Sequence, residues 1–589
     1  MSSTAYKHFL PNDLLHARVL VLDCQTTGSN ADNSHVIEIG WMSCRAADPI
    51  DTQPPPVHTS LVQLPQNAVL SERVARLTGI SGRSLAKAPS ASRVYGRVAN
   101  TAAALAAALG LPMCPTIIHY ARFEKPFLVH LHRQSAVADP LPFNFICTHA
   151  IACRMLSHLP RKGLRAVAGY LGHTVPEDKR SGHHVLATAI VWRRLVQRLI
   201  RTESVRTLSD LERWLSGGNR RMQSVRSYPL DAKKRLDLPD RPGVYKMRLS
   251  NGDVLYVGKA QSIRRRVASY FHKGRKHSEH ILEMLSQARD IDHKLTDTAV
   301  EAALLESDEI KRLNPPYNIA LRTKARRLCF LSPTYNRLAD HPDREHSIGP
   351  LPFNEELRGL TLLVRALNRS SVQPFLDWEY LPVYLYHQPF DRDRLEQGLA
   401  VFKQRYPICC KINPVAGAIR HIGSLLWHQR IILPGQERHD DEKKAEDRPQ
   451  RDELSPDDIA DRFEHTALAG SHLIRRSRWF YRLSESLLTW QTRPDSFSQV
   501  DRRCLRMSGG CVDVFNDHAD ASFARLWLNN PPPQRIVRQQ SIDLPGYDRL
   551  RIVTTELRRL IAQDRKVEIW LSPERRLQNI GLARLLAWI

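Results

Sequence analysis

The pattern of apolar and polar positions predicts alternating strands and helices in the first 200 residues. Strands are expected at 17–22 (ARVLVL) and 35–42 (HVIEIGWM), which are rich in β-branched residues, and further along at CPTIIHY. Helical spacing of apolar residues appears between and after them, in SASRVYGRVANTAAALAAALG and in GHHVLATAIVWRRLVQRLI. This alternation of strand and helix predicts an α/β domain over residues 1–200.

A second and shorter pattern occupies residues 236–325. The segments GVYKMRL and VLYVGK predict two strands joined by a hairpin turn at Asn251-Gly252, and helical patterns follow them. Residues 201–235, which include the basic segment SGGNRRMQS, predict a linker in front of this region. We therefore expect residues 236–325 to form a separate α+β domain.

The remainder of the chain predicts a mainly helical C-terminal region. Residues 326–436 combine apolar runs with many prolines, and residues 437–458 are almost wholly polar, which predicts a solvated linker. The segment 459–589 begins with a long helical pattern and continues with strand-like pieces. Its apolar residues at core spacing favour a packing helix over a nucleic-acid contact surface. These residues are Trp479, Phe480, Leu483 and Leu487.

Composition adds an electrostatic argument. The chain has 86 Lys and Arg against 61 acidic residues, a formal charge of +25. Such a charge attracts polyanions, but without a motif it does not choose between nucleic acid and a membrane surface. The chain has no apolar run of about eighteen residues and no signal-like N-terminus, and its ten cysteines show no metal-site spacing. A cytoplasmic protein with free thiols and no membrane association is expected.

The region 236–325 also concentrates the residue types that phosphodiester hydrolysis needs. Its motifs are PGVY at 242–245, YVGKA at 256–260, RRR at 264–266, SYF at 269–271, EAALLE at 301–306 and NPPYN at 314–318. Each motif alone has a structural explanation, such as a cross-strand aromatic pair or a solvated helix face. Together they supply a carboxylate for a hard divalent cation, an Arg for phosphate, and Tyr with Lys for proton transfer.

These motifs closely resemble the GIY-YIG nuclease family, and within it the UvrC and Cho type. The resemblance implies that Glu306 binds Mg²⁺ or Mn²⁺ and that Arg266 stabilises the phosphate. It also implies that Tyr256 with Lys259 generates the nucleophile. The other implied site residues are Tyr245 and Tyr270, in a tyrosine network around the attacking water, and Asn318, which orients the site.

A different motif set lies in the N-terminal region. Asp23 and Gln25 follow the first strand, Glu124 follows a later one, and His183 stands five residues before Thr188 on the last helix. Their order and spacing resemble the DEDDh exonucleases, the group of the DnaQ proofreading subunit, over residues 15–200. The resemblance implies an RNase H-like fold.

That family clusters four carboxylates around two metal ions, because both reacting oxygens need a cation. Gln25 and Thr188 stand where the resemblance implies two of those acids, which leaves Asp23 and Glu124 as the matched carboxylates. Neutral side chains do not offset the repulsion between two divalent cations, so a degenerate site is expected. His183, or the neighbouring His184, keeps the position of the base.

The expected protein is multidomain: an α/β RNase H-like domain, an α+β GIY-YIG domain, a Cho-like following region at 326–436, and the C-terminal region. The resemblance implies a metal-dependent DNA endonuclease that makes incisions in nucleotide-excision-type repair, with DNA and a UvrB-like damage-loading protein as partners. The UvrC cysteine cluster, second nuclease and helix-hairpin-helix units are not found, so a complete excinuclease subunit is not expected. Two alternatives remain open, a dual nuclease with residual 3′–5′ exonuclease activity and a non-catalytic DNA-binding repair adaptor.

Overall fold

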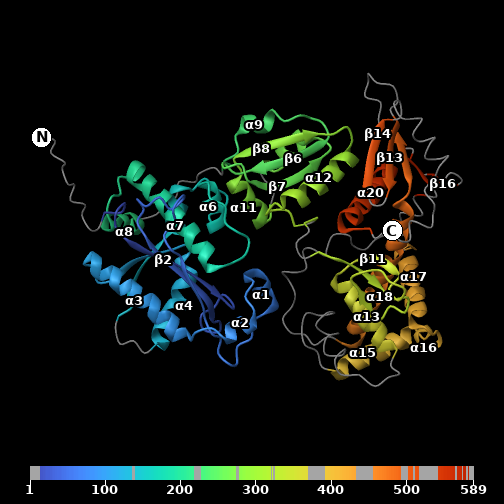
Figure 1. Ribbon diagram of the computed structural model, residues 1–589, viewed down its shortest axis with the longest axis horizontal. Helices are drawn as coiled ribbons and strands as arrows, with labels where there is room; N and C mark the ends of the chain where they lie inside the picture. The colour runs from blue at the N-terminus through green and yellow to red at the C-terminus, as the bar shows by residue number, and fades with distance from the viewer. Residues whose placement is uncertain are drawn as a thin grey trace. The chain divides into compact units, whose positions relative to one another are not determined.

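The computed structural model of the chain forms two compact units. It describes residues 13–135, 140–217, 227–272, 277–319, 321–322, 326–368, 392–432, 455–491, 502–508, 511–516, 542–563, 565, 567–572, 575–578 and 582. The first unit comprises the chain up to Asp297 together with Pro315–Ile319, and the second comprises Thr298–Asn314 and the chain from Ala320 onward. Figure 1 shows the elements of both units in colours that follow the chain from blue to red.

A five-stranded mixed sheet organises the N-terminal domain of the first unit. In spatial order its strands are β3 (His58–Leu61), β2 (Val36–Cys44), β1 (Val19–Thr26), β4 (Cys114–Ile118) and β5 (Phe143–Cys147). β1 pairs antiparallel with β2 and parallel with β4, and β4 pairs parallel with β5. The predicted strands and the predicted α/β class of this domain are confirmed.

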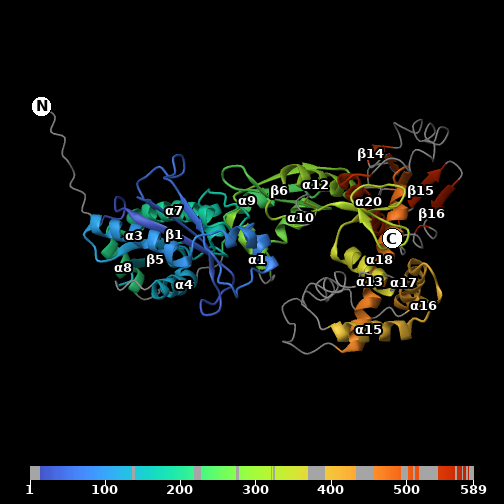
Figure 2. The ribbon, with the colours of Figure 1, turned by 60° about the horizontal axis from the view of Figure 1, so that its bottom comes forward.

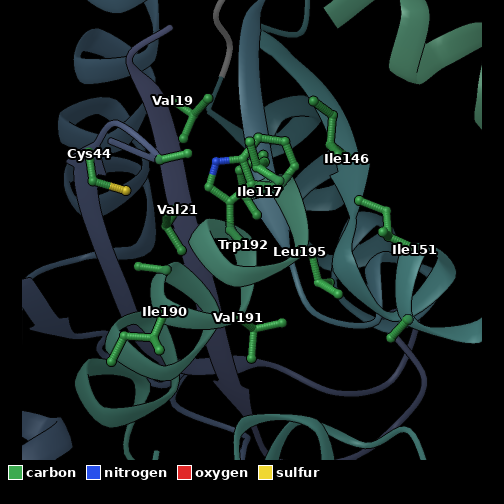
Figure 3. Close-up of a cluster of buried hydrophobic side chains, with 14 of the residues drawn as sticks. Val19, Val21, Cys44, Ile117, Ile146, Ile151, Ile190, Val191, Trp192 and Leu195 are labelled. Atoms are coloured by element: carbon green, nitrogen blue, oxygen red, sulfur yellow. The ribbon is translucent and has the colours of Figure 1, made fainter. Parts of the chain in front are cut away.

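Helices cover both faces of this sheet because β1 is apolar on both sides. Val19 and Val21 face one core, to which α7 (Ser181–Arg198) contributes Trp192. Leu20 and Leu22 face a second core, which is covered by α3 (Ala91–Leu109) and α4 (Ala121–Gln134). Figure 3 shows the first core, where side chains of the strands meet those of α7. Since alternate strand residues share a face, Asp23 and Gln25 continue the face that α7 covers.

Shorter helices complete this domain. They are α1 (Glu72–Thr78), α2 (Gly82–Ala86), α5 (Thr148–Met155), α6 (Leu164–Tyr170), the π-helix η1 (Leu199–Glu203) and α8 (Leu208–Ser216). α8 lies within the segment predicted as a linker at 201–235. It forms because Leu208 and Leu211 are buried in the first core and because Thr207 and Asp210 make a capping box at its start. The described structure therefore shortens that linker.

A three-stranded antiparallel sheet with the order β7-β6-β8 forms the central domain. β6 (Gly243–Arg248) and β7 (Val254–Ala260) make the predicted hairpin, in which Gly252 adopts a φ of 91° that favours glycine. β8 (Asp290–Leu295) pairs with the other edge of β6. The helices of this domain in the first unit are α9 (Ala232–Leu236), α10 (Ile263–Ala268) and α11 (Glu279–Gln287). The predicted α+β class is confirmed.

The N-terminal and central domains of the first unit contact each other through α6 and α11. A side chain at Gly169 of α6 would collide with the amide of Gln287 on α11, so glycine is required for this close approach. The Arg161 N–H donates to Ser286 Oγ at 3.0 Å, and the Arg165 guanidinium lies 5.2 Å from the centroid of the Tyr317 ring. The N-terminal domain therefore contacts the NPPYN segment directly.

Helices form the larger part of the second unit. They are α12 (Ala299–Leu313), α13 (Glu355–Leu367), α15 (Arg392–Arg405), α16 (Ile408–Lys411), α17 (Val415–Ile432) and α18 (Pro456–Leu483). α18 is the long helix that the sequence predicted, and α13, α15 and α17 pack on it (Figure 2). A small sheet accompanies them, with β9 (Leu328–Leu331) between β10 (Leu338–Ala339) and β11 (Ile348–Pro352).

The C-terminal region also contains a second five-stranded sheet, in the part of the sequence that predicted strand-like pieces. Its order is β14 (Cys511–Asn516), β13 (Arg502–Ser508), β12 (Leu487–Gln491), β15 (Val567–Ser572) and β16 (Arg575–Gln578), accompanied by α20 (Leu544–Ala562). α18 ends at Leu483, so Leu487 lies on a strand whereas Phe480 and Leu483 lie on the helix. The apolar period changes from helix to strand within a few residues. Of the predicted linker at 437–458, residues 437–454 lie outside the described residues.

Candidate active site

The β6–β7 hairpin places two of the predicted tyrosines side by side. The register pairs Tyr245 with Gly258 and Met247 with Tyr256, so Tyr245 and Tyr256 share one face of the sheet. Their ring centroids are 6.1 Å apart. A Cβ at Gly258 would lie 2.5 Å from the Tyr245 hydroxyl oxygen, so the glycine of the YVGKA motif makes the space that this hydroxyl occupies.

A third tyrosine joins them from the segment after α10. Tyr245 is fully buried, and its hydroxyl lies 2.9 Å from the hydroxyl of Tyr270. The helix α10 begins at Ser262, whose side chain accepts a hydrogen bond from the Arg265 N–H, and its last turn carries Arg266. The Arg266 guanidinium lies 5.1 Å from the centroid of the Tyr270 ring. The structure thus brings Tyr245, Tyr256, Arg266 and Tyr270 into one cluster.

The electrostatics of this cluster favour a permanently charged Arg266 and a neutral Tyr245. Burial and the neighbouring tyrosine oxygens raise the pKa of Tyr245 well above its usual value. Burial opposes the charge on Arg266, but the oxygens of Tyr245 and Tyr270 outweigh it, and the pKa of Arg266 is raised. Arg266 remains exposed to solvent as well. It can therefore present a fixed positive charge to an incoming phosphate while the tyrosines hold it in place.

Asn318 acts on the backbone of the hairpin. Its Oδ1 accepts from the Val257 N–H at 2.9 Å, and its Nδ2 donates to the Val257 carbonyl at 2.8 Å. Both ends of the buried amide are thus used to hold β7. Val257 stands next to Tyr256, so Asn318 positions the strand that carries this tyrosine.

Lys259 and Tyr256, which the sequence pairs in one role, do not share a face of β7. The register pairs Lys259 with Val244, whereas Tyr256 pairs with Met247. Because successive strand residues point to opposite faces, Lys259 and Tyr256 leave β7 on opposite sides. Strand register therefore does not bring these two side chains together, and their joint role remains a prediction.

Glu306 lies on α12, which belongs to the second unit. Val300 and Leu304 of this helix pack in the core that contains residues of α20, and the Lys311 Nζ lies 3.0 Å from the buried Asp548 carboxylate. Glu306 itself is half-buried. Its carboxylate is the donor type that Mg²⁺ and Mn²⁺ prefer, since these hard cations take oxygen ligands and keep several waters.

The N-terminal domain contains a second polar cluster, on the face of β1 that α7 covers. Gln25 Nε2 donates to Asp23 Oδ2 at 2.7 Å, and both residues are buried. His184 Nδ1 lies 3.2 Å from Asp23 Oδ1 and 3.3 Å from Gln25 Nε2. His183 is exposed and contacts Asp178 instead, at 3.2 Å. The position of the histidine is therefore corrected from His183 to His184, because the next residue of the helix turns towards the sheet.

Glu124 and Thr188 complete this cluster from α4 and α7. Glu124 is buried, and its burial together with the nearby Asp23 carboxylate raises its pKa well above the usual value, so the protonated form is favoured. Glu124 Oε2 and Thr188 Oγ1 have no hydrogen-bond partner among the described residues. Across the same part of the chain, no group of three or more His, Cys, Asp or Glu side chains is arranged to hold a metal ion.

Glu38 is a buried acid that the sequence patterns did not single out. It stands opposite Gln25 in the β1–β2 register. The Arg180 Nε donates to its carboxylate at 3.0 Å, and the Ser181 N–H donates at 2.8 Å. The available signal was a lone acid in the apolar segment HVIEIGWM, which implies a buried charge with a partner. Arg180 neutralises this carboxylate, so it adds little negative charge to the cluster.

Comparisons with known proteins agree with the tyrosine cluster. Residues 241–319 match the family described as the UvrC-like GIY-YIG domain. UvrABC system protein C of Clostridium botulinum is 43% identical over 86 residues, which are 15% of this chain and 14% of that protein. The Clostridium perfringens protein of the same name is 45% identical over 85 residues, 14% of each chain. The chain thus matches about one seventh of the length of these relatives.

A solved structure is also similar over this region. It is the GIY-YIG N-terminal endonuclease domain of UvrC from Thermotoga maritima, bound to its catalytic divalent cation, magnesium. It is 31% identical, and the match covers 15% of this chain and 93% of that one with a TM-score of 0.14. By sequence, residues 241–319 of this chain are thus similar to the UvrC-like GIY-YIG domain. None of the helices in the described ranges is long and apolar enough to cross a membrane.

Proposed function

We propose that this protein is a metal-dependent DNA endonuclease that makes incisions in nucleotide-excision-type repair. The observation that carries the proposal is the cluster of Arg266 with Tyr245 and Tyr270, inside the segment 241–319 that matches UvrC-like domains. A fixed cation beside hydroxyls that exchange protons is what an attack of water on a phosphodiester requires. DNA is the substrate, and a UvrB-like damage-loading protein is the proposed partner.

Each residue has a distinct part in the proposed reaction. Arg266 binds the phosphate oxygens and stabilises the negative charge that develops on them. Tyr256, beside the Tyr245–Tyr270 pair, accepts the proton of the attacking water as it gives up its own hydroxyl proton to solvent, and Lys259 assists from the opposite side of β7. Glu306 would hold a divalent cation, which when bound supplies Lewis-acid stabilisation at the phosphate. Asn318 keeps β7 in register.

The N-terminal domain is proposed to be RNase H-like, with an impaired exonuclease site. Gln25 is neutral, Glu124 favours its protonated form, and Arg180 neutralises Glu38. Two divalent cations held close together need compensating negative charge, which this cluster lacks.

A second candidate is residual exonuclease activity, which one observation favours. Glu124 Oε2 and Thr188 Oγ1 are buried without partners in the described structure, and His184 stands at Asp23 as a base would. These groups can still take one ligand. The candidates separate by product, because an exonuclease shortens ends whereas an endonuclease cuts within a strand.

The proposal is tested with the full chain and three labelled duplexes: undamaged, nicked, and carrying one bulky lesion. Each is incubated with Mg²⁺, with Mn²⁺ and with a chelator, and the products are mapped on a sequencing gel. We expect discrete internal cuts that need a divalent cation and that concentrate near the lesion. Cuts of equal intensity in the chelator would contradict the proposal, and a ladder from the 3′ end would favour the second candidate.

A further inference from the structure

The outer face of α4, in the N-terminal domain, carries a surface cavity of about 440 Å³. Its lining includes Arg122, Lys125, His130 and Arg133 from the helix and Asp32 from the segment after β1. The cavity is separate from the cluster around Asp23, because Glu124, Phe127 and Leu128 lie on the buried face of the same helix.

The cations of this cavity are available to a ligand. Arg122, Lys125 and Arg133 are exposed, and in the described part of the chain none of them forms an ion pair with an acidic side chain. Other arginines of the domain behave differently: Arg193 and Arg194 both bind the Asp51 carboxylate, at 2.9 and 2.7 Å. Lys125 has a cation–π contact with the Phe145 ring, at 5.9 Å, which leaves its charge uncompensated. A concave surface with three such cations and one acid attracts an anion.

The arrangement of the cations suits a linear polyanion. Arg122, Lys125 and Arg133 recur along one side of α4, and at 1.5 Å per residue the row from 122 to 133 is about 16 Å long. Phe127, Leu128 and Leu131 anchor the opposite side of the helix in the second core, so the row faces away from that core. Such a row fits several phosphates in sequence better than a single compact anion.

An aromatic residue, Tyr120, lies at the N-terminal end of α4, next in the chain to the helix that carries the cations but outside the lining of the cavity. It is 47% exposed, its ring centroid lies 5.0 Å from that of His149, and its φ of 78° is a conformation that bulky residues rarely adopt. Exposed aromatic rings beside a basic groove are the usual means of stacking the bases of an unpaired strand. A duplex has no exposed base faces to offer to Tyr120.

We propose that the α4 cavity binds the phosphodiester backbone of a single nucleic-acid strand, with Tyr120 stacking on a base. The choice of nucleic acid rests on the proposed function of the chain, but the binding itself needs neither metal nor cleavage. The cavity holds a single strand next to the N-terminal domain whether or not the exonuclease-like site is active.

The test measures binding of the full chain to a fluorescent oligothymidylate of about fifteen nucleotides by anisotropy, in chelator so that nothing is cut. The cavity variant is Arg122→Glu with Lys125→Glu and Arg133→Glu. The matched control is Arg83→Glu with Lys87→Glu and Arg93→Glu, which makes the same charge change at exposed cations elsewhere in this domain. We expect the cavity variant to bind the strand about tenfold or more weakly than the wild type. The slope of log binding constant against log salt concentration should also become about two smaller in magnitude, whereas the control variant should change little.

Further measurements keep the test decisive. Arg122→Gln with Lys125→Gln and Arg133→Gln should show the same loss without added negative charge, and Tyr120→Ala should weaken binding severalfold. Equal losses in cavity and control variants would overturn the proposal, as would poly-glutamate competing as well as DNA, since that would indicate an acidic protein ligand. If the cavity variant loses strand binding but still incises the lesion-containing duplex, the cavity is supported as a site separate from the nuclease. If the full chain binds the strand but makes no incision, the proposed nuclease function fails and the proposed strand-binding site stands.

Discussion

The hydroxyls of Tyr245 and Tyr270 lie 2.9 Å apart in a buried pair, 25 residues apart in the chain. One comes from the first strand of the hairpin and the other from the segment after α10, so the pair fixes this segment and the preceding Arg266 to the sheet. Arg266 lies over the Tyr270 ring, and its position therefore depends on the pair. This dependence allows the role of each hydroxyl to be measured.

Replacing Tyr245 with phenylalanine should lower the rate of DNA incision by about a hundredfold, the order expected when one proton-transfer group is removed. The ring remains in the core, so folding should be largely retained. Tyr228→Phe is the matched control, because Tyr228 packs edge-on against Phe271 in the same domain, outside the cluster. The measurement is the single-turnover rate on a lesion-containing duplex. Equal rates for the two variants would remove Tyr245 from the mechanism.

A methyl group at position 258 should damage the cluster. In Gly258→Ala the new Cβ would stand 2.5 Å from the Tyr245 oxygen. We expect a loss of about 1–3 kcal/mol in stability, together with slower incision. Gly96→Ala is the control, since Gly96 lies within α3 with open space around it, and alanine there should stabilise by about 0.5–1 kcal/mol. Calorimetry of the full chain gives both values, and a neutral Gly258→Ala would contradict the described packing.

Much of the tyrosine cluster could be predicted from the sequence because the motif spacing is short and the chemistry is specific. Tyr245, Tyr256, Arg266 and Tyr270 lie within 26 residues on a hairpin and one helix, so local structure nearly determines their contacts. The structural role of Asn318 was harder to foresee. It depends on a long-range pairing with the Val257 backbone, which no local pattern indicates.

Two further differences between the prediction and the structure, at the histidine of α7 and in the C-terminal sheet, also have physical causes. His183 and His184 are adjacent, and only the packing of α7 on β1 decides which one turns towards Asp23. The strand β13 reads RRCLRMS, in which arginines conceal the alternation, although Leu505 and Met507 are buried. Arginines among the buried residues of a strand weaken the apolar signal, so the sequence predicted strand-like pieces here but not the sheet that they form.

The raised pKa of Glu124 predicts a pH dependence of the N-terminal domain. Because its folded pKa lies above its usual value of 4.5, the native state holds a proton that the unfolded state has lost, and stability falls as pH rises above about 4.5. Glu124→Gln should remove this loss. Its melting temperature should match that of the wild type near pH 4 and exceed it increasingly towards pH 8, by calorimetry. A difference that does not change with pH would show that Glu124 is ionised in the folded protein.

Restoring the missing acids should create an exonuclease. In the Glu306→Gln background, which is expected to silence the endonuclease, Gln25→Glu with Thr188→Asp should give Mg²⁺-dependent shortening of 3′ ends, since the added charge supports a second cation. Gln53→Glu with Thr52→Asp makes the same charge change at exposed positions and should have no effect. The readout is the ladder from a 5′-labelled strand. Efficient digestion before the acids are restored, abolished by Asp23→Ala, would mean that the site is not degenerate.

Glu306 is proposed to provide the metal site for incision, and Glu309 on the same helix offers a matched comparison. Glu306→Gln and Glu309→Gln remove the same charge from the same helix, α12, and only the first is proposed to bind the cation. The measurement is the Mg²⁺ dependence of incision of a lesion-containing duplex by the full chain. We expect Glu306→Gln to lower incision at least about a hundredfold at every Mg²⁺ concentration, with DNA binding retained, while Glu309→Gln follows the wild type. Full incision by Glu306→Gln with an unchanged Mg²⁺ dependence would contradict it.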